Sequence, residues 1–379
     1  MHIDTFVFER ASGWSVTPLP SMDPTKQTLV LVFGAPSYVD EPAAIEQLMA
    51  AYPGATIAGC STSGEIYGTQ ILDESLSVAV AQLEKTGLRA ASTHVAGLSA
   101  SFGAGADLAT QLAGEGLRAV FVLSDGVSVN GSDLLRGLHS VLDSSVVVTG
   151  GLAGDGSRFQ RTWVLADGKP REKMVVAIGL YGDAIQVSHG SRGGWDIFGA
   201  ERRVTRAAGS VLFELDGQPA LRLYKNYLGD RAAGLPATAL LFPLALRVDA
   251  DPDKMLVRTV LAVDEATESM TFAGDIPEGA RVQLMRANFD RLIEGASDAG
   301  KTANAASAAE TLAIAISCVG RRLVLGERTE EEVEATAGAL SPSTKLVGFY
   351  SYGEVSPFAT GECGDLHNQT MTVTTFWED

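Results

Sequence analysis

Short apolar runs alternate with segments of helical periodicity over the first 150 residues of the chain. The runs QTLVLVFG, RAVFVLSDG and SSVVVTGG have the composition of buried strands, whereas PAAIEQLMAAYPG and NGSDLLRGLHSVLD have helical spacing. Strands that alternate with helices in this way indicate parallel βαβ units. A later segment, EKMVVAIGLYGDAIQVSHG, has the two-residue alternation of antiparallel strands. The sequence therefore predicts a mixed fold, α/β with α+β character.

The chain has 379 residues, which is too long for one ordinary core and predicts two domains. We place these domains at residues 1–215 and 216–379. We expect them to pack together, because no low-complexity linker separates them. The segments AGCSTSGEI and VGFYSYGEV share a glycine, four further residues and then Gly-Glu, which puts Glu65 and Glu354 in matching positions. This internal echo predicts that the two sheet-and-helix domains are related.

Three local patterns lead to specific structural predictions. The Gly-Asp pair at 182–183 lies between two alternating runs, which indicates a hairpin turn with His189 at the hairpin's exit. A long helix is expected from about Ala305. Thr329 and Glu332 have the spacing of a capping box, which predicts the start of another helix.

Charge and cysteine content exclude several classes of protein. The net charge of −17 disfavours nucleic acid and anionic membrane surfaces as partners, because both require a basic face. The longest apolar stretch, around LPATALLFPLAL, is too short to span a bilayer, and the first residues do not have the pattern of a signal peptide. Three widely spaced cysteines without a CxxC pair favour a reducing, cytoplasmic location.

Polar loops after the predicted strands form one candidate site. GCSTSGEI follows a buried strand, and loops at the carboxyl ends of strands are where ligands bind in open α/β sheets. Its hydroxyls and carboxylate could bind a polar small molecule, or they could satisfy a structural turn. A third hypothesis makes Cys60 a catalytic nucleophile, although no motif supplies the base that it would need. The candidate ligand-binding residues are Cys60, Ser61, Thr62, Glu65, Asp155, Tyr352, Glu354 and Asn368.

A second candidate site surrounds His189 in QVSHGSRGGW. A haem site requires a neutral imidazole on iron, apolar and aromatic walls, and cations near the propionates. Arg192, Trp195, Phe198 and Arg202 supply these residue types close to His189 in the sequence. The alternative is that His189 is a loop residue among glycines and that the arginines belong to a solvated face.

Several motifs together resemble the FIST sensory family, which has an N-terminal and a C-terminal FIST domain. They are GCSTSGEI, LSDG, GGLAGDG, GGWDIFGAERRVTRAAGSVLFELDGQPALRLYKNYLG, CVGRRLVLGERTEEEV, GFYSYGEVSPF and LHNQTMTVT, in this order. The resemblance covers the chain from about residue 25 to its end. Within the family, the chain resembles the bacterial nitric oxide-sensing haemoproteins of NosP type, because it carries no kinase or cyclase domain and has a histidine in SHGSRGGW.

The resemblance implies a cytoplasmic sensory protein without enzymatic activity. Its cofactor would be haem b, with His189 as the iron ligand, and nitric oxide would weaken that bond and change the contact with a partner. The partner would be a histidine kinase or a diguanylate cyclase. The alternative function is a haem-free sensor of an amino-acid-like metabolite at the polar loops. A homodimer would suit a signalling protein, although no heptad pattern indicates one.

Overall fold

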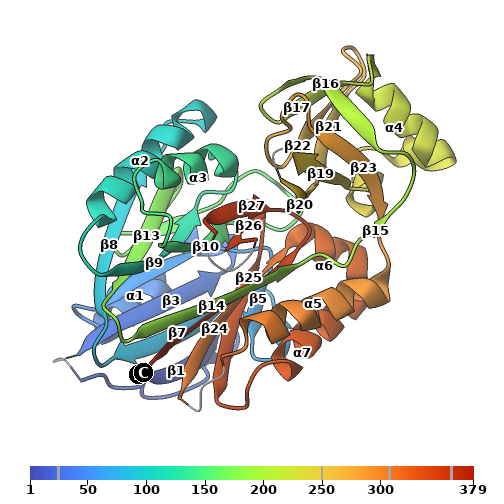
Figure 1. Ribbon diagram of the computed structural model, residues 1–379. Helices are drawn as coiled ribbons and strands as arrows, with labels where there is room; N and C mark the ends of the chain where they lie inside the picture. The colour runs from blue at the N-terminus through green and yellow to red at the C-terminus, as the bar shows by residue number, and fades with distance from the viewer. Residues whose placement is uncertain (24–25, 249–250, 306–308, 359–361) are drawn as a thin grey trace.

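The computed structural model describes residues 1–23, 26–248, 251–305, 309–358 and 362–379, and it confirms a mixed fold of helices and sheets. Three sheets form the body of the molecule, and a fourth sheet belongs to a separate lobe (Figure 1). The three sheets of the body are built by three successive segments of the chain with the same strand order. We call these segments the first repeat (1–83), the second repeat (87–181) and the third repeat (185–378), the last of which contains an inserted module (196–286).

The first repeat places a parallel pair, β3 and β4, beside the antiparallel strands β7 and β1. Its elements are β1 (His2–Glu9), β2 (Gly13–Trp14), β3 (Gln27–Gly34), η1 (Pro36–Val39), α1 (Ala43–Ala51), β4 (Thr56–Ser61), β5 (Glu65–Tyr67), β6 (Gln70–Leu72) and β7 (Ser75–Leu83).

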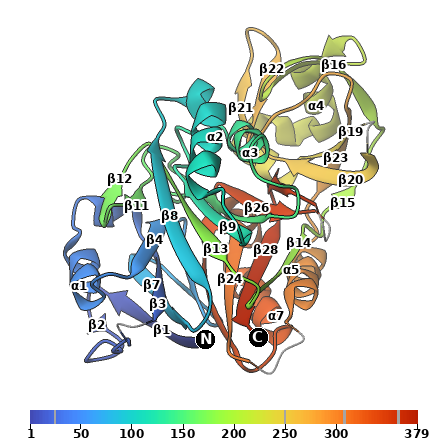
Figure 2. The same ribbon diagram turned by 60° about the vertical axis from the view of Figure 1, so that its left-hand side comes forward.

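The second repeat has the same arrangement, with the parallel pair β9 and β10 beside β13 and β8. Figure 2 shows its two main helices side by side over the sheet. Its elements are β8 (Gly87–His94), η2 (Leu98–Ala100), α2 (Ser101–Leu112), β9 (Leu117–Ser124), α3 (Gly131–His139), β10 (Val147–Leu152), β11 (Val164–Ala166), β12 (Lys169–Arg171) and β13 (Met174–Tyr181).

The third repeat pairs β24 with β25 in parallel and continues through β28 to β14. Its elements are β14 (Ile185–Arg192), α5 (Phe289–Ala303), β24 (Thr311–Cys318), α6 (Val319–Leu325), η5 (Gly326–Arg328), α7 (Thr329–Gly338), β25 (Thr344–Ser351), β26 (Gly353–Pro357), β27 (Gly364–His367) and β28 (Met371–Glu378).

The inserted module interrupts the third repeat between β14 and α5. It is an antiparallel sheet with its own apolar core beneath α4. Its elements are β15 (Asp196–Ile197), β16 (Arg202–Ala208), β17 (Val211–Leu215), β18 (Gln218–Pro219), α4 (Ala220–Leu228), η3 (Gly229–Gly234), η4 (Ala237–Leu241), β19 (Leu244–Val248), β20 (Asp251–Arg258), β21 (Val260–Asp264), β22 (Ser269–Phe272) and β23 (Arg281–Arg286).

Each repeat donates a hairpin to a neighbouring repeat. Hairpin β5–β6 of the first repeat pairs with β25 of the third, hairpin β26–β27 of the third pairs with β10 of the second, and hairpin β11–β12 of the second pairs with β4 of the first. This cyclic exchange ties the body together. The sequence pattern indicates two related segments, around Glu65 and Glu354. The structure shows a third related segment between them, the second repeat.

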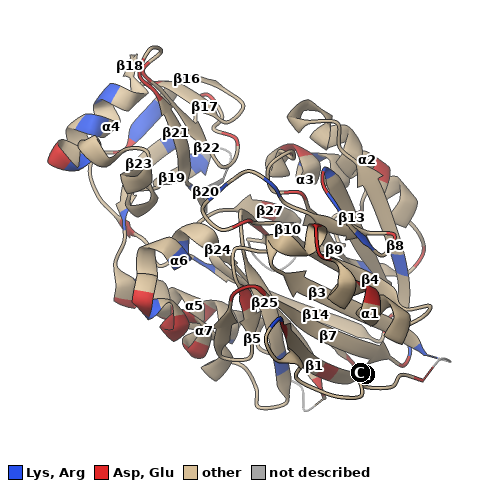
Figure 3. Ribbon diagram, turned by 180° about the vertical axis from the view of Figure 1, so that it is seen from behind, with Lys and Arg blue, Asp and Glu red and all other residues tan. Residues whose placement is uncertain are grey.

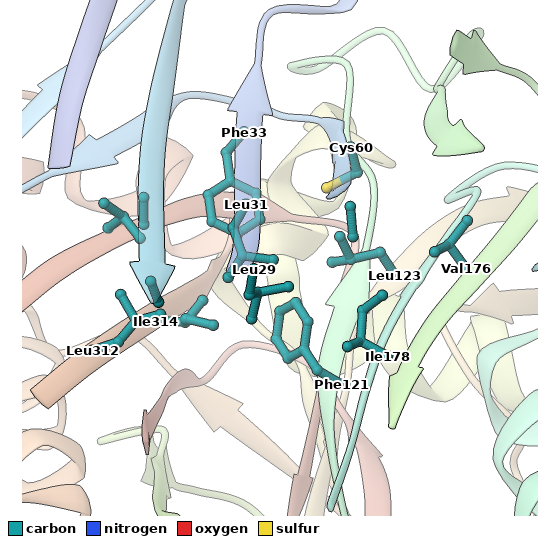
Figure 4. Packing of buried hydrophobic residues seen from close by; sticks show 14 of the residues in the cluster. Leu29, Leu31, Phe33, Cys60, Phe121, Leu123, Val176, Ile178, Leu312 and Ile314 are labelled. Atoms are coloured by element: carbon teal, nitrogen blue, oxygen red, sulfur yellow. The ribbon is translucent and has the colours of Figure 1, made fainter. Parts of the chain in front are cut away.

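Alternate residues of the central strands face two different cores. Leu31 of β3, Phe121 of β9 and Ile314 of β24 face one core that all three repeats share (Figure 4). The intervening residues, such as Val32 and Val122, pack against the helices of their own repeat. Burial of both faces explains why these strands are continuous apolar runs in the sequence.

Equivalent glycines mark the three repeats. Gly59, Gly150 and Gly348 occupy the same position on the second strand of each parallel pair. A Cβ atom at these positions would lie 2.2, 1.8 and 1.8 Å from a carbonyl oxygen of the adjacent strand. Contacts that close exclude every other residue type, so these glycines are required by packing.

Two of the three local predictions are wrong, and the third is right about where a helix starts but wrong about its cap. Residues 182–183 do not form a hairpin turn, because β13 pairs with β8 and β9 while β14 pairs with β28 in another sheet. The segment after Ala305 contains the buried strand β24 where a helix was expected, and residues 306–308 lie outside the described residues. Helix α7 does begin near Thr329, but Thr329 donates to carbonyls and Glu332 binds a buried arginine, so there is no capping box.

The described residues contain no helix that is both long and apolar enough to cross a membrane. Lys and Arg residues are scattered over the body and the module in Figure 3. The predicted domain boundary at residues 215 and 216 falls between β17 and β18 of the inserted module.

Candidate functional site

The loops that follow β4, β10 and β25 converge at the end of the body. Three backbone hydrogen bonds close a ring among them. The amide of Ser63 donates to the carbonyl of Tyr350 (2.8 Å), the amide of Tyr352 donates to that of Leu152 (3.1 Å), and the amide of Gly154 donates to that of Ser61 (2.9 Å). These are equivalent positions in the three repeats, so the ring follows from the repeated architecture.

Two buried glutamates brace this ring. Glu65 accepts hydrogen bonds from the hydroxyl of Thr62 and from the amide and hydroxyl of Ser75. Glu354 has the same arrangement, with Ser351 and Thr370 as its partners. Burial raises the pKa of both carboxyl groups to about 8. The echo in the sequence therefore corresponds to one structural device used twice.

The second repeat uses an aspartate at the corresponding loop. Asp155 accepts hydrogen bonds from the amides of Phe159 (2.8 Å), Gln160 (3.0 Å) and Arg161 (2.9 Å), and from the hydroxyl of Tyr352. These bonds fix the course of the loop after β10. Asp155 thus anchors a turn, with the help of a tyrosine from the third repeat.

Arg322 of α6 reaches over the ring from the third repeat. Its guanidinium donates to the carbonyl of Ser63 (2.6 Å) and binds Asp73 through two hydrogen bonds (2.8 and 2.7 Å). Gly64 makes room for this approach, because a Cβ atom there would lie 2.2 Å from Nη1 of Arg322. The side chain of Arg322 is 26% exposed and that of Asp73 is 66% exposed. This arginine therefore presents a cation at the surface while it remains tied to the ring.

Two adjoining cavities meet at Arg322, with volumes of about 640 and 320 Å³. We call the two together the ring cleft. The residues that line both cavities are Ser63, Asp73, Gly156, Ser157 and Arg322. Carboxylates contribute to the rest of the lining, which includes Glu65, Glu74, Asp155, Glu327 and Glu330. Two cations, Arg322 and Arg158, also line the ring cleft. Cations among hydroxyls and carboxylates suit a small polar ligand that carries both charges.

The neighbouring residue, Arg321, is fully buried and has a structural role. It forms an ion pair with the equally buried Glu332 and donates to the carbonyl oxygens of Gly193, Gln369 and Leu292. These bonds join α6 to α7, to α5 and to the segment that enters the inserted module. Arg321 thereby holds α6 in the position from which Arg322 reaches the ring.

The structure brings the predicted ligand-binding residues to the same end of the body but gives them different roles. Thr62, Glu65 and Asp155 line the ring cleft. Ser61 and Glu354 are buried, and so is Asn368, while Tyr352 lines a different cavity. Cys60 lies in the shared core (Figure 4), where burial raises the pKa of its thiol.

Sequence reasoning missed Ser63, Asp73 and Arg322 as residues of the cleft. Ser63 lies within the quoted motif GCSTSGEI, and Arg322 lies within CVGRRLVLGERTEEEV. No signal in the sequence distinguishes Arg322 from Arg321, and none relates either arginine to Asp73.

The predicted haem residues do not form one pocket. His189 is half-buried on β14, where burial lowers the pKa of its imidazole. Trp195 donates its indole N–H to the carbonyl of Gln369 (2.8 Å), and Arg192 is exposed. Phe198 packs on Phe242 in the core of the module.

Arg202 lies within the inserted module, where its guanidinium already has hydrogen-bond partners. It donates to Asp216 and to the hydroxyl of Tyr227, both at 3.1 Å. The five predicted residues thus belong to a strand of the body, a connecting segment and the module. His189 does not line either cavity of the ring cleft. This set of residues does not fit a haem group, although the neutral imidazole of His189 is the form that binds iron.

Comparisons with known proteins identify the family. Residues 28–218 match the FIST N domain and residues 220–357 match the FIST C domain. No protein of curated function matches the chain significantly. A solved structure of a cyanuric acid hydrolase from A. caulinodans covers 99% of this chain and 98% of its own, at 8% identity and a TM-score of 0.34. A likeness at that level carries no conclusion about this chain. The two domain matches together span most of the sequence, and the chain therefore belongs to the FIST family of sensory proteins.

Proposed function

We propose that this FIST protein senses a small carboxylate-bearing metabolite, such as an amino acid, in the ring cleft. The observation that carries the proposal is the position of Arg322. It is a partly exposed arginine whose fork is occupied by Asp73, a carboxylate that is itself largely exposed. A ligand carboxylate could take the place of Asp73, because a guanidinium binds carboxylates through the same paired geometry.

Acidic residues supply the complementary partner for an ammonium group. Glu327 and Glu330 line the larger cavity beside Arg322, and Glu74 lines the smaller one. The hydroxyl of Ser63 accepts from the amide of Gly156 (3.0 Å), so a ligand that contacts Ser63 would act on a bond between the first repeat and the loop of the second. Binding would therefore change the ring at which all three repeats meet, which is how a local contact could reach a distant surface.

The test is a calorimetric titration with L-glutamate, glycine and succinate as probes. We expect saturable one-to-one binding of at least one probe, which Arg322→Gln weakens at least about tenfold because the carboxylate loses a paired contact. Arg328→Gln is the matched control, because Arg328 is also a paired arginine but does not line the cleft. Equal loss in both variants, or no binding of any probe, would overturn the proposal.

We propose a sensory role for the cleft and no catalytic one. Cys60 has no access to the cleft, and its raised thiol pKa disfavours the thiolate that a nucleophile requires. The partner would be a histidine kinase or a diguanylate cyclase. Its activity, measured with and without this protein and the bound probe, should differ between the two conditions.

Haem binding and nitric oxide sensing form the second candidate, and one observation favours it. Burial lowers the pKa of His189, which keeps its imidazole neutral at neutral pH. The apolar walls of a haem pocket would have to come from side chains other than Trp195 and Phe198. An absorption spectrum after addition of haem decides the question. A sharp Soret band at one haem per chain, which His189→Ala abolishes and His139→Ala preserves, would support haem binding. A broad band alone would overturn this candidate function.

A further inference from the structure

We infer that a second ligand site lies between the inserted module and the second repeat and that it binds a small molecule with a single aromatic ring or an indole. This inference does not depend on the proposed function of the ring cleft. The site is a cavity of about 200 Å³. For comparison, a dry apolar cavity of about 150 Å³ in another protein accommodates benzene. The volume therefore fits one substituted ring.

The walls of the cavity are mainly apolar and come from both lobes. Leu152 and Leu366 line it from the body, and Phe272 lines it from the module. Phe159 and Tyr352 form one wall as a stacked pair, with ring centroids 4.2 Å apart and planes within 14° of each other. A flat apolar wall of this kind favours an aromatic ligand, which can stack on it.

Exposed apolar side chains are concentrated at this cavity. Among the described residues, nine large hydrophobic side chains are exposed, and four of them line it. The four are Leu98, Val127, Phe159 and Leu261. Scattered exposed hydrophobic residues require no explanation, but a group of them around a concave site indicates a binding function.

Two hydroxyl groups could orient the ligand. Ser210 and Thr271 lie in the lining. A phenol hydroxyl or an indole N–H could bond to them. An apolar cavity with a few polar groups is the usual form of a small-molecule site.

Polar contacts between the lobes hold the cavity in shape. Asp275 of the module accepts hydrogen bonds from Asn130 (3.1 Å) and Arg136 (3.2 Å) of the second repeat. The buried Arg258 of the module donates to the carbonyl of Leu366 (3.1 Å). The cavity is therefore formed before a ligand arrives, which lowers the cost of binding.

The test uses phenol and indole as probes and glycerol as a polar control, with saturation-transfer NMR and calorimetry on the full chain. We expect saturable binding of phenol or indole and none of glycerol. Ala273→Phe should weaken binding at least about tenfold, because Ala273 lines the cavity and a larger side chain would fill part of it. Thermal melting of this variant shows whether it folds.

A milder pair of variants keeps the test informative if Ala273→Phe does not fold. Leu261→Ser should weaken binding several-fold, whereas Val141→Ser should not, since Val141 is similarly exposed (42% against 40%) but lies outside the cavity. The inference is overturned if neither aromatic probe binds saturably, if both serine variants behave alike, or if a folded Ala273→Phe variant binds as the wild type does.

Discussion

Arg321 and Arg322 are adjacent on α6, yet one lies inside the protein and the other at its surface. Arg321 is fully buried with Glu332 and three carbonyl oxygens as partners. Arg322 points toward the ring cleft and pairs with an exposed aspartate. Consecutive helical residues differ in direction by about 100°, so such neighbours can face a core and a cavity. The comparison shows that the same side chain can stabilise a fold or present a charge, depending only on what surrounds it.

The largest expected effect is on the buried pair. Glu332→Ala leaves Arg321 buried without a counter-charge, and loss of one partner of such a pair costs about 3–5 kcal/mol. Urea unfolding at neutral pH measures the change. The double variant Arg321→Met with Glu332→Leu should recover much of the lost stability. A Glu332→Ala protein as stable as the wild type would contradict the structural role of this pair.

The next effect concerns the two buried glutamates of the ring. Their carboxyl pKa values are raised from 4.5 to about 8, so the folded state retains protons that the unfolded state releases. The contribution of these carboxyl groups to the free energy of unfolding should therefore fall as the pH rises from about 4.5 to about 8, and it should change little above about 8.

Glu65→Gln tests this pH dependence, since the amide has a similar shape and does not titrate. Each pKa unit corresponds to about 1.4 kcal/mol, and the free energy of unfolding of the variant should fall by about 3 kcal/mol less than that of the wild type between about pH 6 and about pH 9. Unfolding free energies at the two pH values give the result. Parallel curves for the two proteins would show that Glu65 is not the titrating group, and Glu354→Gln gives the matched measurement in the third repeat.

A smaller stability effect is expected for the second arginine. Arg322→Ala removes an ion pair with an exposed partner, and such pairs contribute about 1 kcal/mol or less. Urea unfolding should show this modest change beside the large one for Glu332→Ala. If Arg322→Ala destabilised the protein as much as Glu332→Ala does, Arg322 would be a structural residue like Arg321.

The smallest effect should follow from Asp73→Asn. This change removes the charge that competes for Arg322 and leaves the loop otherwise intact. We expect probe binding to tighten several-fold, with stability altered by less than about 1 kcal/mol. Calorimetry with the carboxylate probe that binds the wild type measures it. Weaker binding would mean that Asp73 contacts the ligand directly and does not occupy the position of the ligand's carboxylate.

The sequence by itself determined the mixed fold, several of the long buried strands and the loops that carry the ring. These features depend on local patterns: apolar runs for strands buried on both faces, and glycines where no Cβ atom fits. The resemblance between GCSTSGEI and FYSYGEV was visible because the same backbone packing and the same buried glutamate recur. The third copy, TGGLAGDG, carries Asp155 one position earlier than the two glutamates, so the Gly-Glu pattern does not detect it.

Only the tertiary structure decided which side chains meet. The strand β24 was expected to be helical, because a buried apolar run has no period that separates the two. The boundary between the second and third repeats falls between β13 and β14, which places β14 and His189 in another sheet from β13. The inserted module then separated His189 from Phe198 and Arg202 despite their closeness in sequence. Proximity along the chain fixes local structure, whereas the position of Arg322 depends on contacts with Ser63 and Asp73, which are 259 and 249 positions away.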